Sequence, residues 1–167
     1  GLALRTLWSG RHGRFAIILA GLNLLATPLD LALAVRERKL YARAGTPDLP
    51  IAFICGPPRS GTTLVANAVA RVTRAAYFTN VTAVYPRAPI TASRLFRAGP
   101  RNDKLTLRSH YGRTAGFRGW NDGLHLWDRW LGRDRGAVCH HIDRRRAAEM
   151  VRFFGAFEEW SRLPLVT

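Results

Sequence analysis

A short apolar run followed at once by a loop with two glycines limits how this chain can fold. The run is Ile51–Cys55, and its unbroken hydrophobicity is typical of a strand buried on both faces of a parallel sheet. The loop is Gly56–Gly61, and the residues from Thr62 to about Arg74 have the 3.6-residue period of a helix. The expected apolar face of this helix consists of Leu64, Val65, Ala68, Val69 and Val72. The sequence therefore predicts a strand, a loop and a helix in succession, within an α/β fold.

Two further helices and a second strand are predicted downstream. The first helix covers Leu124–Trp130, with Asn121 or Asp122 as its N-cap residue. The second helix follows Asp143, whose short carboxylate side chain is also a favoured N-cap. Leu163–Thr167 then resembles another buried strand.

The loop has the composition of a phosphate-binding site. Between a strand and a helix, free backbone N–H groups and the positive end of the helix dipole point at one place. Gly61 is expected where the backbone passes close to the anion. Gly56, Gly61 and Thr63 fit the nucleotide-triphosphatase pattern G-x-x-x-x-G-K-[ST]. However, Thr62 stands in place of its lysine and the loop's cation is Arg59, which argues against ordinary ATP or GTP hydrolysis.

The run G-P-P-R-S-G-T-T after an apolar strand closely resembles the 5′-phosphosulfate loop of sulfotransferases. These enzymes use 3′-phosphoadenosine 5′-phosphosulfate (PAPS) as the donor and share a P-loop-like α/β fold. Weaker similarity extends to Tyr85–Ile90 and Tyr111–Thr114, and Asn121–Gly132 resembles part of the acceptor region of bacterial members. The resemblance covers about residues 45–167 and is strongest at 51–65.

The resemblance implies an enzyme that transfers a sulfuryl group from PAPS to a hydroxyl of a carbohydrate, glycolipid or small-molecule acceptor. The cofactor-binding residues that it implies are Pro58, Arg59, Ser60, Gly61, Thr62 and Thr63. Arg59 would also be catalytic, because its charge would neutralise the bridging oxygen as the sulfuryl group leaves. Positioning and electrostatics dominate an in-line transfer of this kind.

Sulfotransferases carry a second element, an arginine and a serine that hold the 3′-phosphate, and none is recognised before Thr167. The sequence is therefore expected to be an N-terminal fragment of such an enzyme. Its P-loop-like parallel sheet, flanked by helices, would be incomplete in this chain. Residues 1–44 would form an N-terminal apolar and basic helical segment, and residues 45–167 the first part of the catalytic domain.

The acceptor hydroxyl needs a general base, and His125 is the first candidate. Asp122 and His125 lie three residues apart, which places both on one helix face, where a carboxylate can orient an imidazole. His110 and Asp122 itself are the alternatives. A fourth interpretation is that His125 is an ordinary helix residue packed near Trp127.

A metal site is not expected. Cys139, His140 and His141 are consecutive, and Asp143 follows closely. Structural zinc sites, however, use four ligands in recognisable pairs, and the sequence has no second pair.

Phe15–Val35 is the most apolar stretch of the chain and is long enough in principle to cross a bilayer. Asn23, Pro28 and Asp30 interrupt it, and basic residues flank both of its ends. It is interpreted as a packed or interfacial helix kinked at Pro28, or alternatively as a transmembrane anchor. Basic flanks suit anionic headgroups, so an anionic membrane surface is a candidate partner of residues 1–44.

The charge balance is unusual, with 26 Lys and Arg against 11 Asp and Glu and a net charge of +15. It indicates an anionic partner, namely nucleic acid, an acidic membrane or a phosphate- or sulfate-bearing ligand, or else a genome that favours arginine codons. Two functions compete with sulfuryl transfer: a P-loop kinase-like nucleotide-binding protein, and a non-enzymatic basic protein that binds membranes or nucleic acid. No known nucleic-acid motif is present, so nucleic acid is not an expected partner. The expected location is the cytoplasm, with membrane association through residues 1–44 as an alternative.

Overall fold

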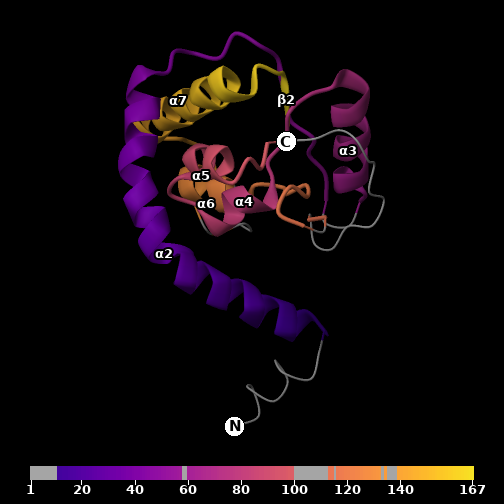
Figure 1. The fold of residues 1–167 in the computed structure, drawn as a ribbon. Coiled ribbons are helices and arrows are strands. Elements are labelled where there is room, and N and C mark those ends of the chain that lie inside the picture. Colours follow the sequence, from indigo (N-terminus) through magenta and orange to yellow (C-terminus); the bar gives the residue numbers. More distant parts are fainter. Residues whose placement is uncertain (1–10, 58–59, 100–112, 115, 133, 135–138) are drawn as a thin grey trace.

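The computed structural model describes residues 11–57, 60–99, 113–114, 116–132, 134 and 139–167, and Figure 1 shows its fold. In chain order the elements are α2 (Arg11–Arg43), β1 (Ile51–Ala52), α3 (Thr62–Thr73), α4 (Asn80–Val84), α5 (Pro89–Leu95), α6 (Leu124–Leu131), α7 (Arg144–Ser161) and β2 (Leu165–Val166). The structure is therefore mixed α/β, mainly helical, with a small parallel sheet. The predicted helix from Thr62 and the second strand are confirmed, and Asp143 caps α7 as predicted by accepting from the backbone N–H of Arg146 at 2.9 Å.

β2 lies between β1 and the segment that follows α3. β1 and β2 are parallel, with Ile51 opposite Leu165. On the other side of β2, Ala76 forms a parallel bridge with the same Leu165, and the backbone N–H of Val166 donates to the carbonyl of Ala76 at 2.9 Å. After β1 the chain passes through α3 and returns to the sheet at Ala76, two positions away from β1. β2 occupies the position between them.

Isolated bridges extend this arrangement beyond Ala76. Thr79 pairs antiparallel with Trp120, and Asn121 pairs antiparallel with Arg113. The backbone N–H of Asn121 donates to the carbonyl of Phe78 at 2.8 Å. We call the whole set of paired segments, from β1 through β2 and Ala76 to Arg113, the ladder.

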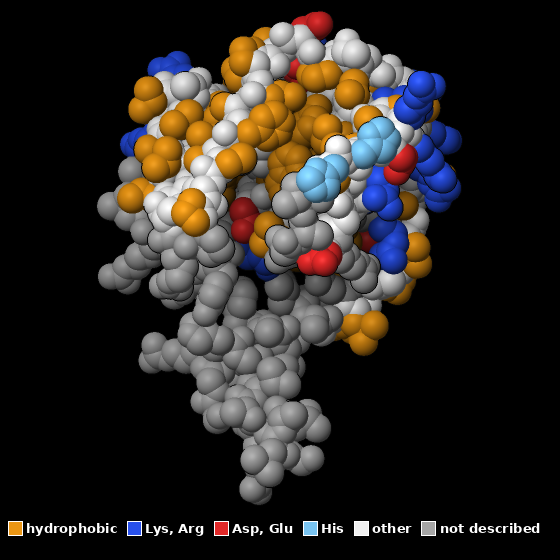
Figure 2. Space-filling model, turned by 180° about the vertical axis from the view of Figure 1, so that it is seen from behind, with side chains coloured by type: hydrophobic (Ala, Val, Ile, Leu, Met, Phe, Trp, Pro, Cys, Tyr) orange, Lys and Arg blue, Asp and Glu red, His pale blue; other side chains and the backbone are white. Residues whose placement is uncertain are grey.

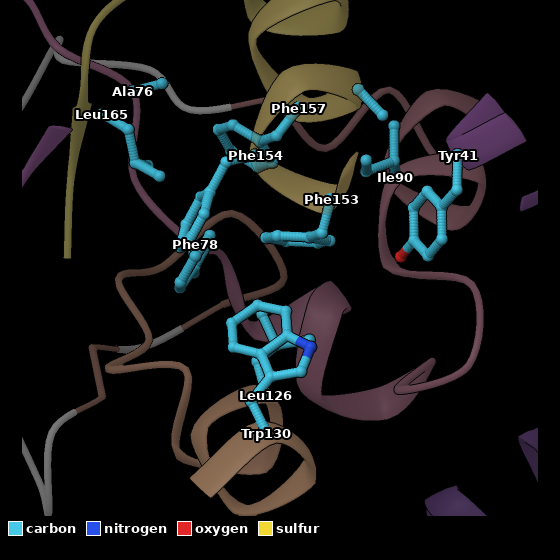
Figure 3. Packing of buried hydrophobic residues seen from close by; sticks show 11 residues of the cluster. Tyr41, Ala76, Phe78, Ile90, Leu126, Trp130, Phe153, Phe154, Phe157 and Leu165 are labelled. Atoms are coloured by element: carbon cyan, nitrogen blue, oxygen red, sulfur yellow. The ribbon is translucent and has the colours of Figure 1, made fainter. Parts of the chain in front are cut away.

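Helices cover both faces of the ladder, with α3 on one side and α5, α6 and α7 on the other (Figure 1). Successive side chains of β2 point to opposite faces of the ladder. Val166 packs with Ala66 and Ala70 of α3, whereas Leu165 packs in the cluster on the face covered by α6 and α7. Figure 3 shows that larger cluster, in which aromatic rings of α7 meet residues of α6 and the ladder. Its buried members are Tyr41, Ala76, Phe78, Ile90, Leu126, Trp130, Phe153, Phe154, Ala156, Phe157 and Leu165.

The buried face of α3 differs from the predicted one. Ala66 and Ala70 are buried against the ladder, whereas Leu64, Val65 and Val72 are exposed. The helical period places these two sets on opposite sides of α3. Of the predicted face, Val69 does pack against the cluster that contains Ala66 and Ala70. The prediction is wrong for Leu64, Val65 and Val72 because it rests on the larger apolar side chains, while the small alanine side chains allow α3 to approach the ladder closely.

The N-terminal apolar segment is helical, as predicted, and lies within α2. Pro28 is inside this helix, and Figure 1 shows that α2 bends and that its N-terminal part extends away from the body of the protein. Proline removes one bond of the helical hydrogen-bond series, which favours bending. Within the described part of the chain, no helix is both long enough and apolar enough to cross a membrane.

A buried carboxylate on α2 holds the start of α5. Glu37 is only 1% exposed. Its Oε1 accepts from the backbone N–H of Ile90 at 3.1 Å, and its Oε2 accepts from the backbone N–H and the hydroxyl of Thr91 at 2.7 and 2.6 Å. The first N–H groups of a helix lack intrahelical acceptors and attract negative charge. Glu37 therefore supplies from α2 the acceptors that α5 needs.

Asp30 makes a similar attachment two helical turns earlier. It accepts from the backbone N–H groups of Arg87 and Ala88, each at 3.1 Å, and forms an ion pair with the Arg87 guanidinium at 3.3 Å. Burial raises the pKa of Asp30 above its ordinary value, and the hydrogen bonds and charge of Arg87 oppose that change. Both acidic residues of α2 therefore face the body of the protein.

Replacing Glu37 by alanine should lower the free energy of unfolding by about 2–4 kcal/mol, because three donors lose their acceptor inside the protein. Urea denaturation followed by circular dichroism measures the change. Arg38→Ala, at the adjacent exposed position, is the matched control and should stay within about 0.5 kcal/mol of wild type. A loss below about 1 kcal/mol in Glu37→Ala would show that these bonds do not hold α2 in place.

Candidate functional site

The predicted phosphate loop joins β1 to α3. Strand pairing continues beyond β1, because the backbone N–H of Ile54 donates to the carbonyl of Thr167 at 2.8 Å. The backbone N–H of Ser60 then donates to the carbonyl of Pro57 at 3.2 Å, which closes a turn. Gly61 follows as the N-cap residue of α3. The expected succession of strand, loop and helix is therefore present.

The structure describes four of the six residues predicted to bind the cofactor. Ser60 and Gly61 are exposed, and Thr62 and Thr63 are half-buried in the first turn of α3. Pro58 and Arg59 lie outside the described residues. The role of Arg59 is therefore inferred from its position in the sequence motif alone.

The two glycines of the loop have different structural roles. Gly61 has φ +86°, a left-handed conformation that side chains with a β-carbon adopt only with strain. A β-carbon there would meet no protein atom within 4 Å, so no packing within the described residues requires glycine at this position. At Gly56, by contrast, a β-carbon would lie 2.8 Å from both Ser60 Oγ and Thr62 Cγ2. Gly56 thus leaves room for these two side chains to fold back over the loop.

The first turn of α3 offers hydrogen-bond donors. The backbone N–H groups of Leu64 and Val65 both donate to the carbonyl of Gly61, at 2.9 and 3.1 Å. Within the described residues, the N–H groups of Thr62 and Thr63 have no such acceptor, and no side chain caps the helix. The first turn contains no acidic residue. Unpaired donors at the positive end of a helix dipole suit an anion.

The start of α6 is held by a network of amides. Gly123, with φ +68°, is the N-cap residue in place of the predicted Asn121 or Asp122. Asn121 is fully buried, and its Oδ1 accepts from the backbone N–H of Gly123 at 2.9 Å while its Nδ2 donates to Asn80 Oδ1 at 3.1 Å. A β-carbon on Gly123 would lie 2.4 Å from the ring of Phe78, so only glycine fits between this turn and the core. The predicted cap residues Asn121 and Asp122 instead stabilise the turn before α6, by accepting from the backbone N–H groups of Gly123 and Leu124.

His125 is partly buried on α6, and both of its ring nitrogens are shielded from solvent. Neither nitrogen has a hydrogen-bond partner among the described residues, so the expected bond from Asp122 is not formed. Asp122 instead accepts from the backbone N–H of Leu124 at 3.3 Å. Burial, and then the positive charge of Arg113, lower the pKa of His125 from 6.5 to about 4. The imidazole is therefore neutral at pH 7.

An aromatic surface that the sequence analysis did not identify lies at the end of β1. Phe53 is half exposed and meets the rings of Trp127 and Phe154 edge-on, with centroids 5.8 and 6.1 Å away. The indole N–H of Trp127 donates to the carbonyl of Asp122 at 3.2 Å, which fixes its ring against α6. Phe53 precedes the loop by three residues, and its ring packs with Trp127 and Phe154 on the α6 and α7 side of the ladder. The sequence places Phe53 in an unbroken apolar run and carries no signal that its side chain is exposed.

The remaining candidates do not form a site in the described part of the chain. Cys139, His140 and His141 are exposed, and no group of three or more His, Cys, Asp or Glu side chains among the described residues is arranged to hold a metal ion. The alternative base His110 lies outside the described residues.

Comparisons of the chain with protein-family models, with curated proteins and with solved structures find no match. A function for this protein therefore has to be argued from the loop motif and from the geometry described above.

The low pKa of His125 predicts that stability depends on pH. The unfolded chain binds the proton more readily than the folded protein, so stability is full above about pH 6.5 and falls as the pH drops towards 4. This difference corresponds to about 3 kcal/mol at most. Urea unfolding of wild type and His125→Gln at several pH values measures it. The variant should show a shallower loss, and parallel curves would show that His125 is not buried in its neutral form.

Proposed function

We propose that this chain contains the donor-binding loop of a sulfotransferase, which transfers a sulfuryl group from PAPS to a hydroxyl-bearing acceptor. The observation that carries the proposal is the run G-P-P-R-S-G-T-T between β1 and α3, with Gly61 in the left-handed conformation at the start of α3. A P-loop-like fold for the catalytic domain is part of the same proposal. It is supported by the order of the ladder, in which β2 separates β1 from the segment after α3.

Ser60, Gly61, Thr62 and Thr63 would hold the 5′-phosphate of the donor. Support comes from the unpaired N–H groups of Thr62 and Thr63 among the described residues, and from the lack of an acidic residue in the first turn of α3. Arg59 would add the positive charge that the bridging oxygen needs as the sulfuryl group leaves. Among the described residues, we propose none that would bind the 3′-phosphate of the donor.

The acceptor would approach at the edge of the ladder where β1 and β2 end. Both strands run in the same direction, and ligands of open α/β sheets bind beyond the carboxyl ends of such strands. Phe53 follows β1 directly at this edge, and its half-exposed ring lies edge-on to Trp127. The half-exposed ring of Phe53 offers apolar surface to an acceptor, which favours a carbohydrate or glycolipid over a highly charged molecule.

In the proposed reaction the acceptor oxygen bonds to sulfur while the bond between sulfur and the phosphate oxygen breaks. The hydroxyl proton passes to a base, and adenosine 3′,5′-bisphosphate leaves. His125 is neutral at pH 7, but both of its ring nitrogens are shielded from solvent and its low pKa makes it a weak base. Asp122, at the start of the same helix, is the alternative.

Calorimetric titration of the protein at its natural length with adenosine 3′,5′-bisphosphate and with ATP–magnesium tests the donor site. The bisphosphate should bind more tightly, and Thr62→Ala should weaken its binding about tenfold to a hundredfold through loss of one hydrogen bond to a charged group. Thr73→Ala is the control, because its exposed hydroxyl lies at the far end of α3 and donates to the carbonyl of Val69. Preference for ATP–magnesium would identify a kinase-like loop and overturn the proposal.

Arg59→Ala should reduce turnover of PAPS about 10²–10³-fold, the scale of losing one group that stabilises a transition state. Arg71→Ala, an exposed cation in the last turn of α3, removes the same charge away from the loop and should leave turnover unchanged. An Arg59→Ala enzyme that keeps activity within about tenfold of wild type would contradict the role of this residue.

A further inference from the structure

The side of α2 that faces away from the body of the protein is apolar over three turns. Large side chains there are far more exposed than is usual for aliphatic residues: 75% for Leu24, 81% for Leu25, 51% for Leu31 and 55% for Val35. Leu24, exposed Pro28, Leu31 and Val35 follow one another at spacings of four, three and four residues, which aligns them along one side of a helix. We call Leu24, Leu25, Pro28, Leu31 and Val35 the outer stripe.

Cations follow the outer stripe directly along α2. Arg36, Arg38, Lys39 and Arg43 are all exposed. Figure 2 shows Lys and Arg side chains gathered along one side of the molecule. The described outward side of α2 is therefore apolar first and then basic.

The two acidic residues of α2 point the other way. Asp30 and Glu37 are each 1% exposed, and their carboxylates bind the start of α5. No negative charge of α2 therefore reaches its outward side. This separation of charge is produced by the packing of the helix and not by its composition.

We propose that the outer stripe and the cations that follow it bind the surface of an anionic lipid bilayer. A lipid surface presents an acyl layer and negatively charged headgroups next to each other, and these match the two parts of this helix side. The aliphatic stems of Lys39 and Arg43 can lie along the apolar layer while their charges reach the headgroups. A nucleic acid would pair with the cations but would leave the outer stripe in water. The helix would lie in the membrane interface. Because Asp30 and Glu37 attach the body of the protein to α2, the body would be held next to the headgroups.

Co-sedimentation of the whole protein with vesicles tests the proposal. Vesicles of phosphatidylcholine with about one third phosphatidylglycerol are compared with pure phosphatidylcholine, at low and high salt. Leu24→Ser/Leu31→Ser should reduce binding to the anionic vesicles more than about tenfold, because two exposed leucines no longer enter the acyl layer. Val72→Ser/Val151→Ser, which removes two exposed apolar side chains from α3 and α7, should bind like wild type.

The position of the charges is tested separately. Arg36→Gln/Lys39→Gln/Arg43→Gln should reduce binding to anionic vesicles at least about tenfold and leave little salt dependence. Arg71→Gln/Arg94→Gln/Arg152→Gln removes the same charge from exposed positions on three other helices and should bind like wild type. Equal losses in the two triple variants would show general attraction of a basic protein, which would overturn the proposal.

Two further results would also overturn it. Wild-type protein that does not sediment with anionic vesicles excludes a lipid partner. A dimer in light scattering that Leu24→Ser/Leu31→Ser abolishes, without vesicle binding, would assign the outer stripe to contact between two copies of the chain. Circular dichroism and melting temperature of every variant show whether the fold is intact. The test does not involve PAPS, so its outcome is independent of the proposed function.

Discussion

The attachment of α2 depends on two carboxylates placed where water does not reach them. A buried charge is costly unless it is paired or fully hydrogen-bonded, and Glu37 meets that condition through three donors at the start of α5. Asp30 meets it through Arg87 and Ala88. Because these partners lie on one side of α2, they also decide which side of the helix faces outward. One set of contacts thus fixes the packing of the helix, the position of α5 and the character of the exposed surface.

The elements that the sequence predicted correctly are those with local signals. The helix from Thr62, the Asp143 cap and the final strand depend on residues within one or two turns of each other, and all three are present. The buried face of α3 and the N-cap of α6 depend instead on distant partners. Gly123 is selected by the ring of Phe78, 45 positions earlier, and no pattern within α6 contains that information.

The candidate site divides in the same way. The position of the loop between a strand and a helix follows from the local sequence, and the left-handed backbone of Gly61 is a separate reason for glycine at that position. The surroundings of His125 do not follow from it. Its low pKa comes from burial and from Arg113, which the ladder brings near, and the spacing to Asp122 suggested a hydrogen bond that the fold does not make. Phe53 was missed because an aromatic residue in a strand is ordinarily a core residue.

The order of the ladder has a consequence for how the protein is made. Ile51 and Ala76 belong to the two segments that flank β2, yet neither has its neighbour until Leu165 and Val166 have been synthesised. On a ribosome, the loop and α3 emerge long before the strand that joins their two flanking segments. Closing the ladder then requires contacts across more than about a hundred residues, which is slow and leaves strand edges unpaired in the meantime. The nascent chain therefore exposes the loop between β1 and α3 before that loop has a sheet to support it, and chaperone contact is expected during this interval.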